Sequence, residues 1–282
     1  MMKDVVFGQY YPTDSGVHHM DARAKVLLTL AYIVLIFFVD SFVGYFAFAL
    51  FVLAVTLVAK VPLRTLLRSV KGVAFLMVFI SVINAFFSGL GEPLWKWWVL
   101  SVSVDSLLHA AKMALRILLL VLGPALLTYT TTPMELTDAI ESLLTPLKLV
   151  HFPVRDLAVI MSIALRMVPT LMEETDRIML AQKARGASLD TGNFFQRIRA
   201  LVPILIPLFV GAFRRAEELA LALDARCYNA SPKRTRYRIL RLTWRDLVGL
   251  LVFGALLAVI VLGLVRYDFD GMIYDLVRSW VV

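Results

Sequence analysis

The chain has 282 residues, of which 60% are apolar and 18% charged, and its mean hydropathy is +0.79. Soluble globular chains are roughly 45–50% apolar and about 25% charged, so this chain is expected to be solvated at least partly by lipid. The composition excludes a disordered chain, a coiled coil and a secreted disulfide scaffold. The single cysteine, Cys227, cannot form an internal bridge, and redox chemistry is not expected.

The net charge of +8, from 29 basic and 21 acidic residues, fits either nucleic acid or anionic lipid as a partner. The positions of the basic residues decide between them, because they alternate with apolar residues or follow expected helix ends. Five of them stand just before the last apolar stretch: Lys233, Arg234, Arg236, Arg238 and Arg241. This run favours contact with anionic membrane lipid, and no nucleic-acid partner is expected.

The residues that precede the first apolar stretch are expected to cap and anchor a helix. Asp21 is placed to be its N-cap, and Arg23 and Lys25 are expected to reach to the membrane interface. No short apolar stretch with a small-residue cleavage site precedes Asp21, so no cleavable signal is expected. His18, His19 and Asp21 form an alternative metal-ligand set, but adjacent histidines converge poorly, and capping or interface roles are favoured.

Long apolar stretches predict an all-α integral membrane protein with about five transmembrane helices. Residues 26–59 carry one charge, Asp40, and as a single helix would be about 50 Å long against about 30 Å of hydrocarbon. Two crossings, broken at Asp40 and Ser41, are therefore predicted, and the first is expected to begin before residue 26. Further spans are predicted at residues 72–87, 106–131 and 247–265.

Lysine and arginine counts predict the orientation. Residues 133–245 carry 17 basic and 11 acidic side chains, and the positive-inside rule places this region and the N-terminus in the cytoplasm and the C-terminal tail outside. Trp95, Trp97 and Trp98 then fall in an outer loop, where an aromatic belt is expected. The expected organisation is residues 1–132 with four spans, 133–245 as a cytoplasmic region, and 246–282 with the fifth span and an external tail.

The region between the fourth and fifth spans is too apolar for a water-soluble loop and too charged for lipid-spanning helices. It is therefore expected to form amphipathic helices that lie against the membrane and reach into the cytoplasm. A short helix is predicted at residues 135–149, followed by two long ones at 154–183 and 194–225. Prolines inside the long helices predict bends at Pro169, Pro203 and Pro207.

Both long helices end with the pattern Leu-Ala-x-x-Ala-Arg, and the two copies are 41 residues apart. The first copy ends at Ala184, Arg185 and Gly186, and the second at Ala225, Arg226 and Cys227. The helix macrodipole favours arginine at a C-terminus, and its planar fork can hold a carboxylate or backbone carbonyls of a partner. Simple capping of the last carbonyls is the alternative, but two copies in register favour two similar receivers.

An N-terminal run adds a second pattern: Gly8, Tyr10, Pro12, Ser15 and His18, followed by Asp21, Ala22, Arg23, Ala24 and Lys25. Together with the two Ala-Arg motifs, this run resembles the transmembrane T component of energy-coupling factor transporters, the EcfT family. The resemblance extends from about residue 8 to the fifth span. The family's motifs are of the Ala-Arg-Gly type, so Cys227 departs from them, and the second helix is expected to end on a less permissive backbone.

The resemblance implies a non-catalytic subunit of an ATP-driven importer in the bacterial inner membrane. T components join two ATP-binding cassette ATPases of the EcfA type to a membrane-embedded substrate-binding S component, and the complex imports vitamins or transition-metal ions. Arg185 and Arg226 would dock into grooves on the two ATPases, and the bent helices would transmit ATPase closure to the S component. ATP and Mg²⁺ would be used by the ATPases, and no cofactor would bind this chain directly.

One polar face in the fourth span leaves two interpretations open. It is formed by residues at i, i+4, i+7 and i+11, namely Asp105, His109, Lys112 and Arg116. It is either a helix-packing stripe, with Asp105 or Glu92 compensating the cations, or a seam that faces the S component or a substrate path. The second interpretation supports a competing function, a self-contained secondary permease. An intramembrane enzyme is disfavoured, because no nucleophile with its base is evident. The sequence has no Gly-Lys pair for a phosphate loop, so ATP is expected to be hydrolysed elsewhere.

Overall fold

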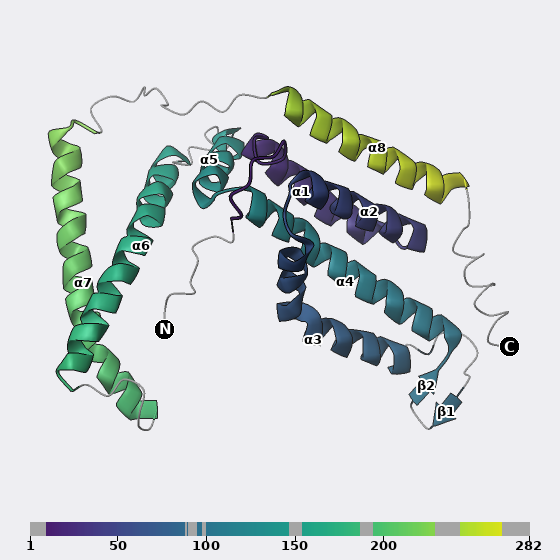
Figure 1. Cartoon of the computed structure of the whole chain (residues 1–282), viewed down its shortest axis with the longest axis horizontal. Coiled ribbons are helices and arrows are strands. Elements are labelled where there is room, and N and C mark those ends of the chain that lie inside the picture. Colours follow the sequence, from purple (N-terminus) through teal and green to yellow (C-terminus); the bar gives the residue numbers. More distant parts are fainter. Residues whose placement is uncertain are drawn as a thin grey trace. The chain divides into compact units, whose positions relative to one another are not determined.

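The computed structural model describes residues 10–87, 89, 95–97, 100–146, 154–186, 194–228 and 243–266 (Figure 1). Within these ranges the chain forms the helices α1 (Ala22–Phe38), α2 (Phe42–Val58), α3 (Leu63–Phe87), α4 (Val104–Thr130), α5 (Pro133–Leu143), α6 (Val154–Ala184), α7 (Phe194–Ala225) and α8 (Trp244–Arg266). Two three-residue strands, β1 (Trp95–Trp97) and β2 (Leu100–Val102), pair antiparallel with Trp95 opposite Val102. The all-α prediction is therefore confirmed for the helices and missed this short hairpin.

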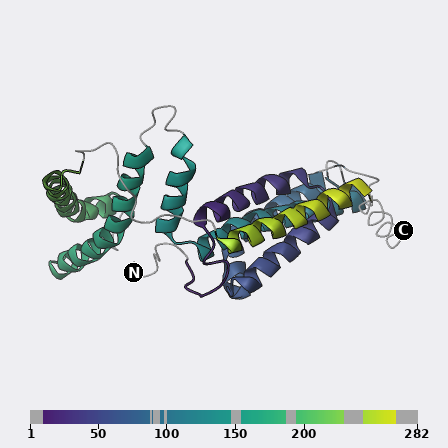
Figure 2. The same cartoon turned by 90° about the horizontal axis from the view of Figure 1, so that it is seen from above.

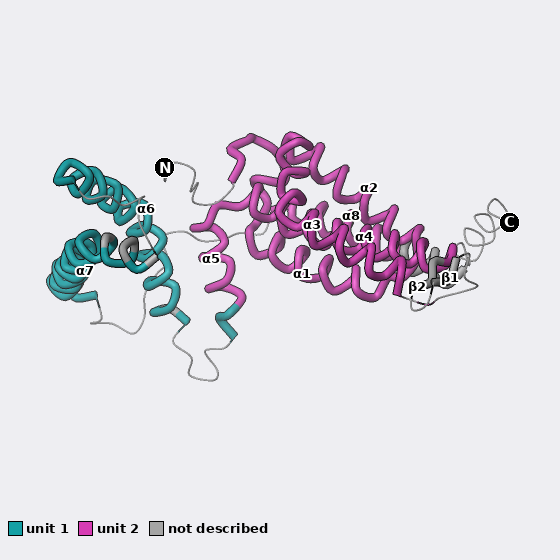
Figure 3. The backbone as a smooth tube through the Cα atoms, turned by 90° about the horizontal axis from the view of Figure 1, so that it is seen from below, with its two compact units in different colours: residues 1–7, 144–240 teal, residues 8–143, 241–282 magenta. Residues whose placement is uncertain are grey.

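The helices divide into two compact units, drawn in different colours in Figure 3. The first, called here the membrane unit, contains α1 to α5 and α8, from residues 8–143 and 241–282. The second, called here the crossing unit, contains α6 and α7, from residues 144–240. Helix α5, which the sequence grouped with the region 133–245, packs against α1 and so belongs to the membrane unit.

The predicted spans coincide with helices of the membrane unit. The break expected at Asp40 and Ser41 is confirmed, because α1 ends at Phe38 and α2 begins at Phe42. Helix α3 begins at Leu63, before the predicted start at residue 72, since hydropathy marks only its apolar part and the basic first turns remain helical. By length and composition α3 and α4 can cross a membrane, and α2 is a shorter apolar helix of 17 residues.

Side-chain caps explain where several helices begin. Asp21 is the N-cap of α1, as predicted, and its Oδ1 accepts from the backbone N–H of Arg23 at 2.9 Å. At α5, Thr132 and Glu135 form a capping box in which each side chain accepts from the other residue's N–H, at 3.3 and 3.4 Å. Each cap satisfies backbone donors that would otherwise lack a partner at a helix end.

The core of the membrane unit is a row of aromatic side chains that joins α1, α2 and α8. The ring of Tyr32 meets Phe48 edge-on, with centroids 5.3 Å apart, and lies nearly parallel to Phe51 at 6.4 Å. Phe51 in turn meets Phe253 of α8 at 5.7 Å. Such contacts add to the apolar burial that drives these helices together, and they fix α8 against α2.

Polar contacts tie the N-terminal segment to the ends of α4 and α8. Lys25 is only 6% exposed, and its Nζ donates to the backbone oxygens of Thr130 at 2.9 Å and His18 at 3.1 Å. The prediction that Lys25 reaches to the interface is therefore wrong, because acceptors inside the unit hold the ammonium. Asp246 Oδ1 accepts from the N–H of Asp21 at 2.7 Å, which joins the start of α8 to the start of α1.

The crossing unit consists of two antiparallel helices, seen side by side in Figures 1 and 2. The side-chain amide of Gln182, near the end of α6, donates to the backbone oxygen of Pro203 in the first half of α7 at 3.5 Å. Glu174, earlier in α6, pairs with Arg215, later in α7. The residue numbers thus run in opposite directions along the contact, as in an α-helical hairpin.

Candidate functional site

The two arginine motifs predicted from the sequence lie at the C-terminal ends of α6 and α7. At the end of α6, the N–H of Gly186 donates to the carbonyl of Lys183 at 3.0 Å. At the end of α7, the N–H of Cys227 donates to Asp224 at 2.9 Å, and that of Tyr228 donates to Leu223 at 3.0 Å. This pair of bonds at α7 is a Schellman motif, and the described part of the α6 end repeats its inner bond.

Both helices end through the same left-handed turn, although only one has glycine there. Gly186 has φ of 86° and Cys227 has φ of 52°. The sequence predicted a less permissive backbone at Cys227, and the structure places this cysteine in the conformation that glycine favours. A side chain in this conformation costs about 1 kcal/mol, so the second tip keeps its geometry against a local strain.

The tips are open to their surroundings. All six residues of the two motifs are exposed: Ala184, Arg185, Gly186, Ala225, Arg226 and Cys227. Each arginine therefore stands at the negative end of a helix dipole with alanine before it and a turn after it. Such a tip can insert between side chains of another molecule, and the guanidinium can bind a carboxylate or a row of carbonyls.

The prolines expected to bend the long helices all lie inside helical segments, Pro169 in α6 and Pro203 and Pro207 in α7. Figure 1 shows α7 changing direction along its length. Proline removes a backbone hydrogen bond and its ring crowds the preceding turn, which is the physical reason for such a change. A further proline, Pro124, lies inside α4.

The charged face of α4 is directed, at its Arg116 end, to the turn between α1 and α2. Arg116 pairs with the carboxylate of Asp40, and its guanidinium also donates to Val39 O at 3.1 Å and Tyr45 Oη at 2.8 Å. The nitrogen of Lys112 lies 4.8 Å from the centre of the Phe42 ring. These contacts fit a helix-packing role at this end of the face, and the carboxylate that pairs with Arg116 is that of Asp40.

The other two members of that face lie nearer the N-terminus of α4. Asp105 is in the first turn, where the positive end of the helix dipole favours a carboxylate, and it is half-buried. His109 is half-buried one turn further on. The structure therefore engages Arg116 and Lys112 with α2 and its preceding turn, while the role of Asp105 and His109 stays a prediction.

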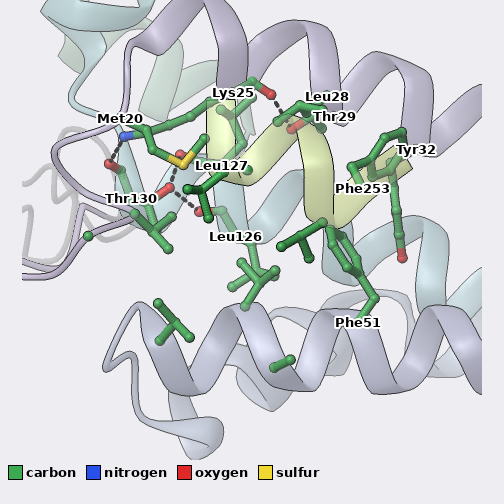
Figure 4. Close-up of a pocket in the computed structure, with 18 of the residues that line it drawn as sticks. Met20, Lys25, Leu28, Thr29, Tyr32, Phe51, Leu126, Leu127, Thr130 and Phe253 are labelled. Atoms are coloured by element: carbon green, nitrogen blue, oxygen red, sulfur yellow. Dashed lines mark hydrogen bonds between the residues drawn. The ribbon is translucent and has the colours of Figure 1, made fainter. Parts of the chain in front are cut away.

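A groove of about 380 Å³ runs between α1, α2, α4 and α8 (Figure 4). Its lining is mainly apolar, and the polar side chains labelled in Figure 4 bond to backbone carbonyls of the unit itself. Thr29 donates to Lys25 O at 2.8 Å, Tyr32 to Leu119 O at 2.9 Å, and Thr130 to Leu126 O at 2.8 Å. These polar groups are already hydrogen-bonded to backbone carbonyls of the helices, so they do not converge on a polar substrate.

The N-terminal histidines bond to separate neighbours. His18 Nε2 lies 3.0 Å from Tyr11 O and Nδ1 lies 2.7 Å from Ser15 Oγ, and burial lowers the pKa of the imidazole below its ordinary value. The neutral ring therefore donates from Nε2 and accepts at Nδ1. His19 Nε2 lies 2.6 Å from Asp14, and this hydrogen bond holds the pKa of the carboxyl below its ordinary value. The two rings thus serve the fold of the N-terminal segment.

Other predicted features fall outside the described residues. The basic run from Lys233 to Arg241, the expected lipid contact, lies wholly outside them, as does the C-terminal tail. Of the tryptophans expected in an aromatic belt, Trp95 and Trp97 are described only as backbone in β1, and Trp98 is not described. Lipid contact by these segments stays a prediction.

The sequence reasoning overlooked the contact between α6 and α7. Glu174 and Arg215 form an ion pair there, with side chains 30% and 36% exposed. A signal was present, because these residues are also 41 residues apart, the spacing of the arginine motifs. Opposite charges at equivalent positions of two similar helices are compatible with contact between those positions, and the structure shows that contact.

A unit of apolar helices, with two exposed arginine-tipped helices beside it in the chain, is typical of a membrane subunit that acts through other proteins. Comparison with known proteins agrees. The model of the CbiQ family, described as cobalt transport protein, matches residues 14–237. The chain therefore belongs to the class of transmembrane components of transporters.

Relatives of known name identify the family. The chain is 47% identical over 263 residues to the energy-coupling factor transporter transmembrane protein EcfT of Clostridium kluyveri, covering 93% of this chain and 97% of the relative. It is 44% identical to the EcfT proteins of Ruminiclostridium cellulolyticum, over 88% of this chain and 92% of the relative, and of Thermosediminibacter oceani, over 90% and 96%. The chain belongs to the EcfT family, and the resemblance noted from its motifs is confirmed.

Proposed function

We propose that this chain is the coupling subunit of an energy-coupling factor importer. Two partner ATPases of the ATP-binding cassette type bind the tips of α6 and α7, and a membrane-embedded S component binds the substrate. Movement of the ATPases on ATP binding shifts α6 and α7, and this shift reorients the S component. The imported compound belongs to the vitamins or transition-metal ions, and ATP with Mg²⁺ is used by the ATPases alone.

One observation carries this proposal: two exposed helix ends of the same sequence pattern share the same left-handed turn and present arginine. A capping role needs neither exposure nor repetition, whereas docking to two similar ATPases needs both. The flanking residues Ala184 and Ala225 support docking, because their small side chains leave room for a groove wall close to the helix. Two equal tips thus correspond to two ATPase subunits.

The apolar helices of the membrane unit support a membrane arrangement for the proposed subunit. We propose that five helices span the bacterial inner membrane, namely α1, α2, α3, α4 and α8. The excess of basic residues in 133–245 supports a cytoplasmic crossing unit and N-terminus and an external C-terminal tail. In this orientation the arginine tips are on the side where ATP is available.

The test is a double charge reversal, Arg185→Glu with Arg226→Glu, made in the chain co-expressed with its ATPases and S component. The acceptors that would hold a docked guanidinium repel a carboxylate in its place. We therefore expect ATPase co-purification and ATP-driven uptake to fall about tenfold or more. The matched control is Arg177→Glu with Arg214→Glu, which makes the same charge change at exposed positions away from the tips. This control is expected to keep both activities.

Unchanged ATPase binding and uptake in the tip variant would contradict the proposal. Equal amounts of both variants in the membrane fraction establish that insertion is intact. Solute movement driven by an ion gradient in liposomes that contain this chain alone would instead support the secondary permease.

A further inference from the structure

Helices α6 and α7 meet at positions that are equivalent in their shared pattern. The arginine motifs are offset by 41 residues, and the same offset relates Glu174 to Arg215, the residues that pair across the contact. In an antiparallel pair, contact between equivalent positions requires a local twofold axis that passes through the contact. The crossing unit is therefore approximately symmetric about the Glu174–Arg215 pair.

The two helices carry opposite charges at the contact, and the approximate twofold symmetry favours this difference. Residues 173 and 174 are both glutamate, and their equivalents 214 and 215 are both arginine. Two identical residues on a twofold axis would place like charges face to face, which is repulsive. Because α6 carries glutamate and α7 carries arginine at this point, the two side chains attract each other where the helices meet.

The helices approach closely at this pair. A Cβ added at Gly211, one turn before Arg215, would lie 3.5 Å from Oε1 of Glu174. This is an ordinary van der Waals distance, so a side chain as small as alanine would just reach the glutamate from α7. Both charged side chains are about one-third exposed, so they are screened less than the exposed pair of Arg214 and Glu218 on α7, where the side chains are 79% and 66% exposed.

The arms that lead from this contact to the tips are equal and free of proline. Arg185 lies eleven positions after Glu174, and Arg226 eleven positions after Arg215, which is about 16 Å of helix in each case. The arms leave in opposite directions, so the tips are roughly 30 Å apart. The prolines at 169, 203 and 207 all precede the contact in their own helices. Each arm is thus expected to be straight, and bending is confined to the part of each helix that precedes the contact.

We propose that Glu174 and Arg215 are the pivot at which the two coupling helices cross, and that this pair sets the position of Arg185 relative to Arg226. The arginine tips are thereby presented to two sockets related by an approximate twofold axis. This inference rests on the proposed function for the identity of the sockets, but the geometry of the pivot is a property of this chain alone.

The experiment compares single charge reversals with a charge swap. The variants are Glu174→Arg, Arg215→Glu and the two combined, with Glu174→Gln as a milder change that keeps the size of the side chain. The matched control is Arg214→Glu, which makes the same reversal one residue away in the exposed pair. Spin labels at the native Cys227 and at an Ala184→Cys substitution report the distance between the tips in the full chain without partners.

We expect a narrow distance distribution in the parent chain and the control, and a broad or displaced one in both single reversals. The swap restores the narrow distribution, because the opposite charges meet again. In the co-expressed complex, each reversal lowers ATPase retention about tenfold and the swap returns it to within about twofold of the parent. Glu174→Gln is expected to lie between the parent and the reversals.

Two results would overturn the pivot: an unchanged tip distance in both reversals, or a swap no better than the single changes. Failure of the proposed function looks different. In that case the reversals would alter the tip distance and the swap would restore it, while ATPase retention stayed the same throughout. The distance measurement therefore judges the pivot, and the retention measurement judges the docking.

Discussion

The membrane unit and the crossing unit are held together by different kinds of contact. In the membrane unit, buried side chains from α1, α2, α4 and α8 form one core, and long-range hydrogen bonds join the helix ends. In the crossing unit, Val154 and Ile204 are the only buried residues described, and large side chains such as Phe209 and Phe213 of α7 are exposed. The first unit is thus held by its own core, whereas many of the large apolar side chains described in the second are exposed.

The comparison teaches where a substitution should act. A change in the membrane unit is expected to alter the free energy of unfolding, because a close-packed interior has no room to adjust. A change in the crossing unit is expected to alter partner binding while the membrane unit melts as before. The following variants test that distinction, in order of expected effect.

Gly123→Ala should destabilise the membrane unit most. An added Cβ would overlap the ring of Tyr32, and this ring has little freedom to move, since it is 3% exposed and bonded to Leu119 O. We expect a loss of about 2–3 kcal/mol in the free energy of unfolding, or roughly 5–10 °C in the melting temperature of the detergent-solubilised chain. Gly254→Ala is the control, because a Cβ there meets open space. Equal melting temperatures for the two variants would contradict close packing at Gly123.

Asp246→Ala should have the next largest effect. Its carboxylate accepts from the N–H groups of Asp21 at 2.7 Å and Thr243 at 2.6 Å, and it is 4% exposed. Removal leaves a buried donor without a partner, at a cost of about 2 kcal/mol. Asp246→Asn keeps one acceptor oxygen and is expected to lose less, as measured by thermal unfolding in detergent. The tie between α1 and α8 would be disproved if alanine and asparagine were both neutral.

The helix tips should respond in opposite directions to changes of the turn residue. Gly186→Ala puts a side chain into the left-handed turn and is expected to cost about 1 kcal/mol, while Cys227→Gly relieves strain and gains roughly 0.5–1 kcal/mol. Amide hydrogen exchange in the last turns of α6 and α7 measures these local changes. The melting temperature of the membrane unit serves as the internal control and should stay constant. Faster exchange at the α7 end in Cys227→Gly would refute the shared turn.

Asp40→Asn should have the smallest effect. Arg116 is largely buried, but its partner Asp40 is 83% exposed, so solvent screens the pair and its loss is expected to cost about 0.5 kcal/mol or less. Arg116→Met should cost more, because Tyr45 Oη loses its donor and Val39 O keeps only the Tyr45 hydroxyl as donor. Thermal unfolding of the two variants side by side measures the difference. If Asp40→Asn were as damaging as Arg116→Met, the ion pair rather than the backbone contact would hold the turn.

Much of the fold could be predicted from local sequence. The bounds 194–225 of α7 agree with the structure, and the break at Asp40 and the N-cap at Asp21 were also correct. These features depend on hydropathy, helix length and side chains close in sequence. The burial of Lys25 could not be predicted in this way, because its acceptor at Thr130 is 105 residues away. The β1–β2 hairpin was missed because three-residue strands give too short a pattern.

The candidate site shows the same division. The two arginine tips could be predicted, because their repeated pattern is visible in the amino-acid sequence alone. The pairing of Arg116 with Asp40 needs the packing of α4 against α2, which neighbours in sequence do not indicate. Compensation of the other cations by Asp105 or Glu92 stays a prediction. Glu174 and Arg215 were available to the same repeat analysis and were overlooked, since the comparison sought identical residues rather than opposite charges.

The hydrogen bond between Asp21 and Asp246 has a consequence for biogenesis. The two residues are 225 positions apart, with the whole crossing unit between them in the chain. During synthesis α6 and α7 are therefore made before α8, which carries Asp246. This hydrogen bond can form only after α8 has been made, and until then the N–H of Asp21 lacks its acceptor on Asp246.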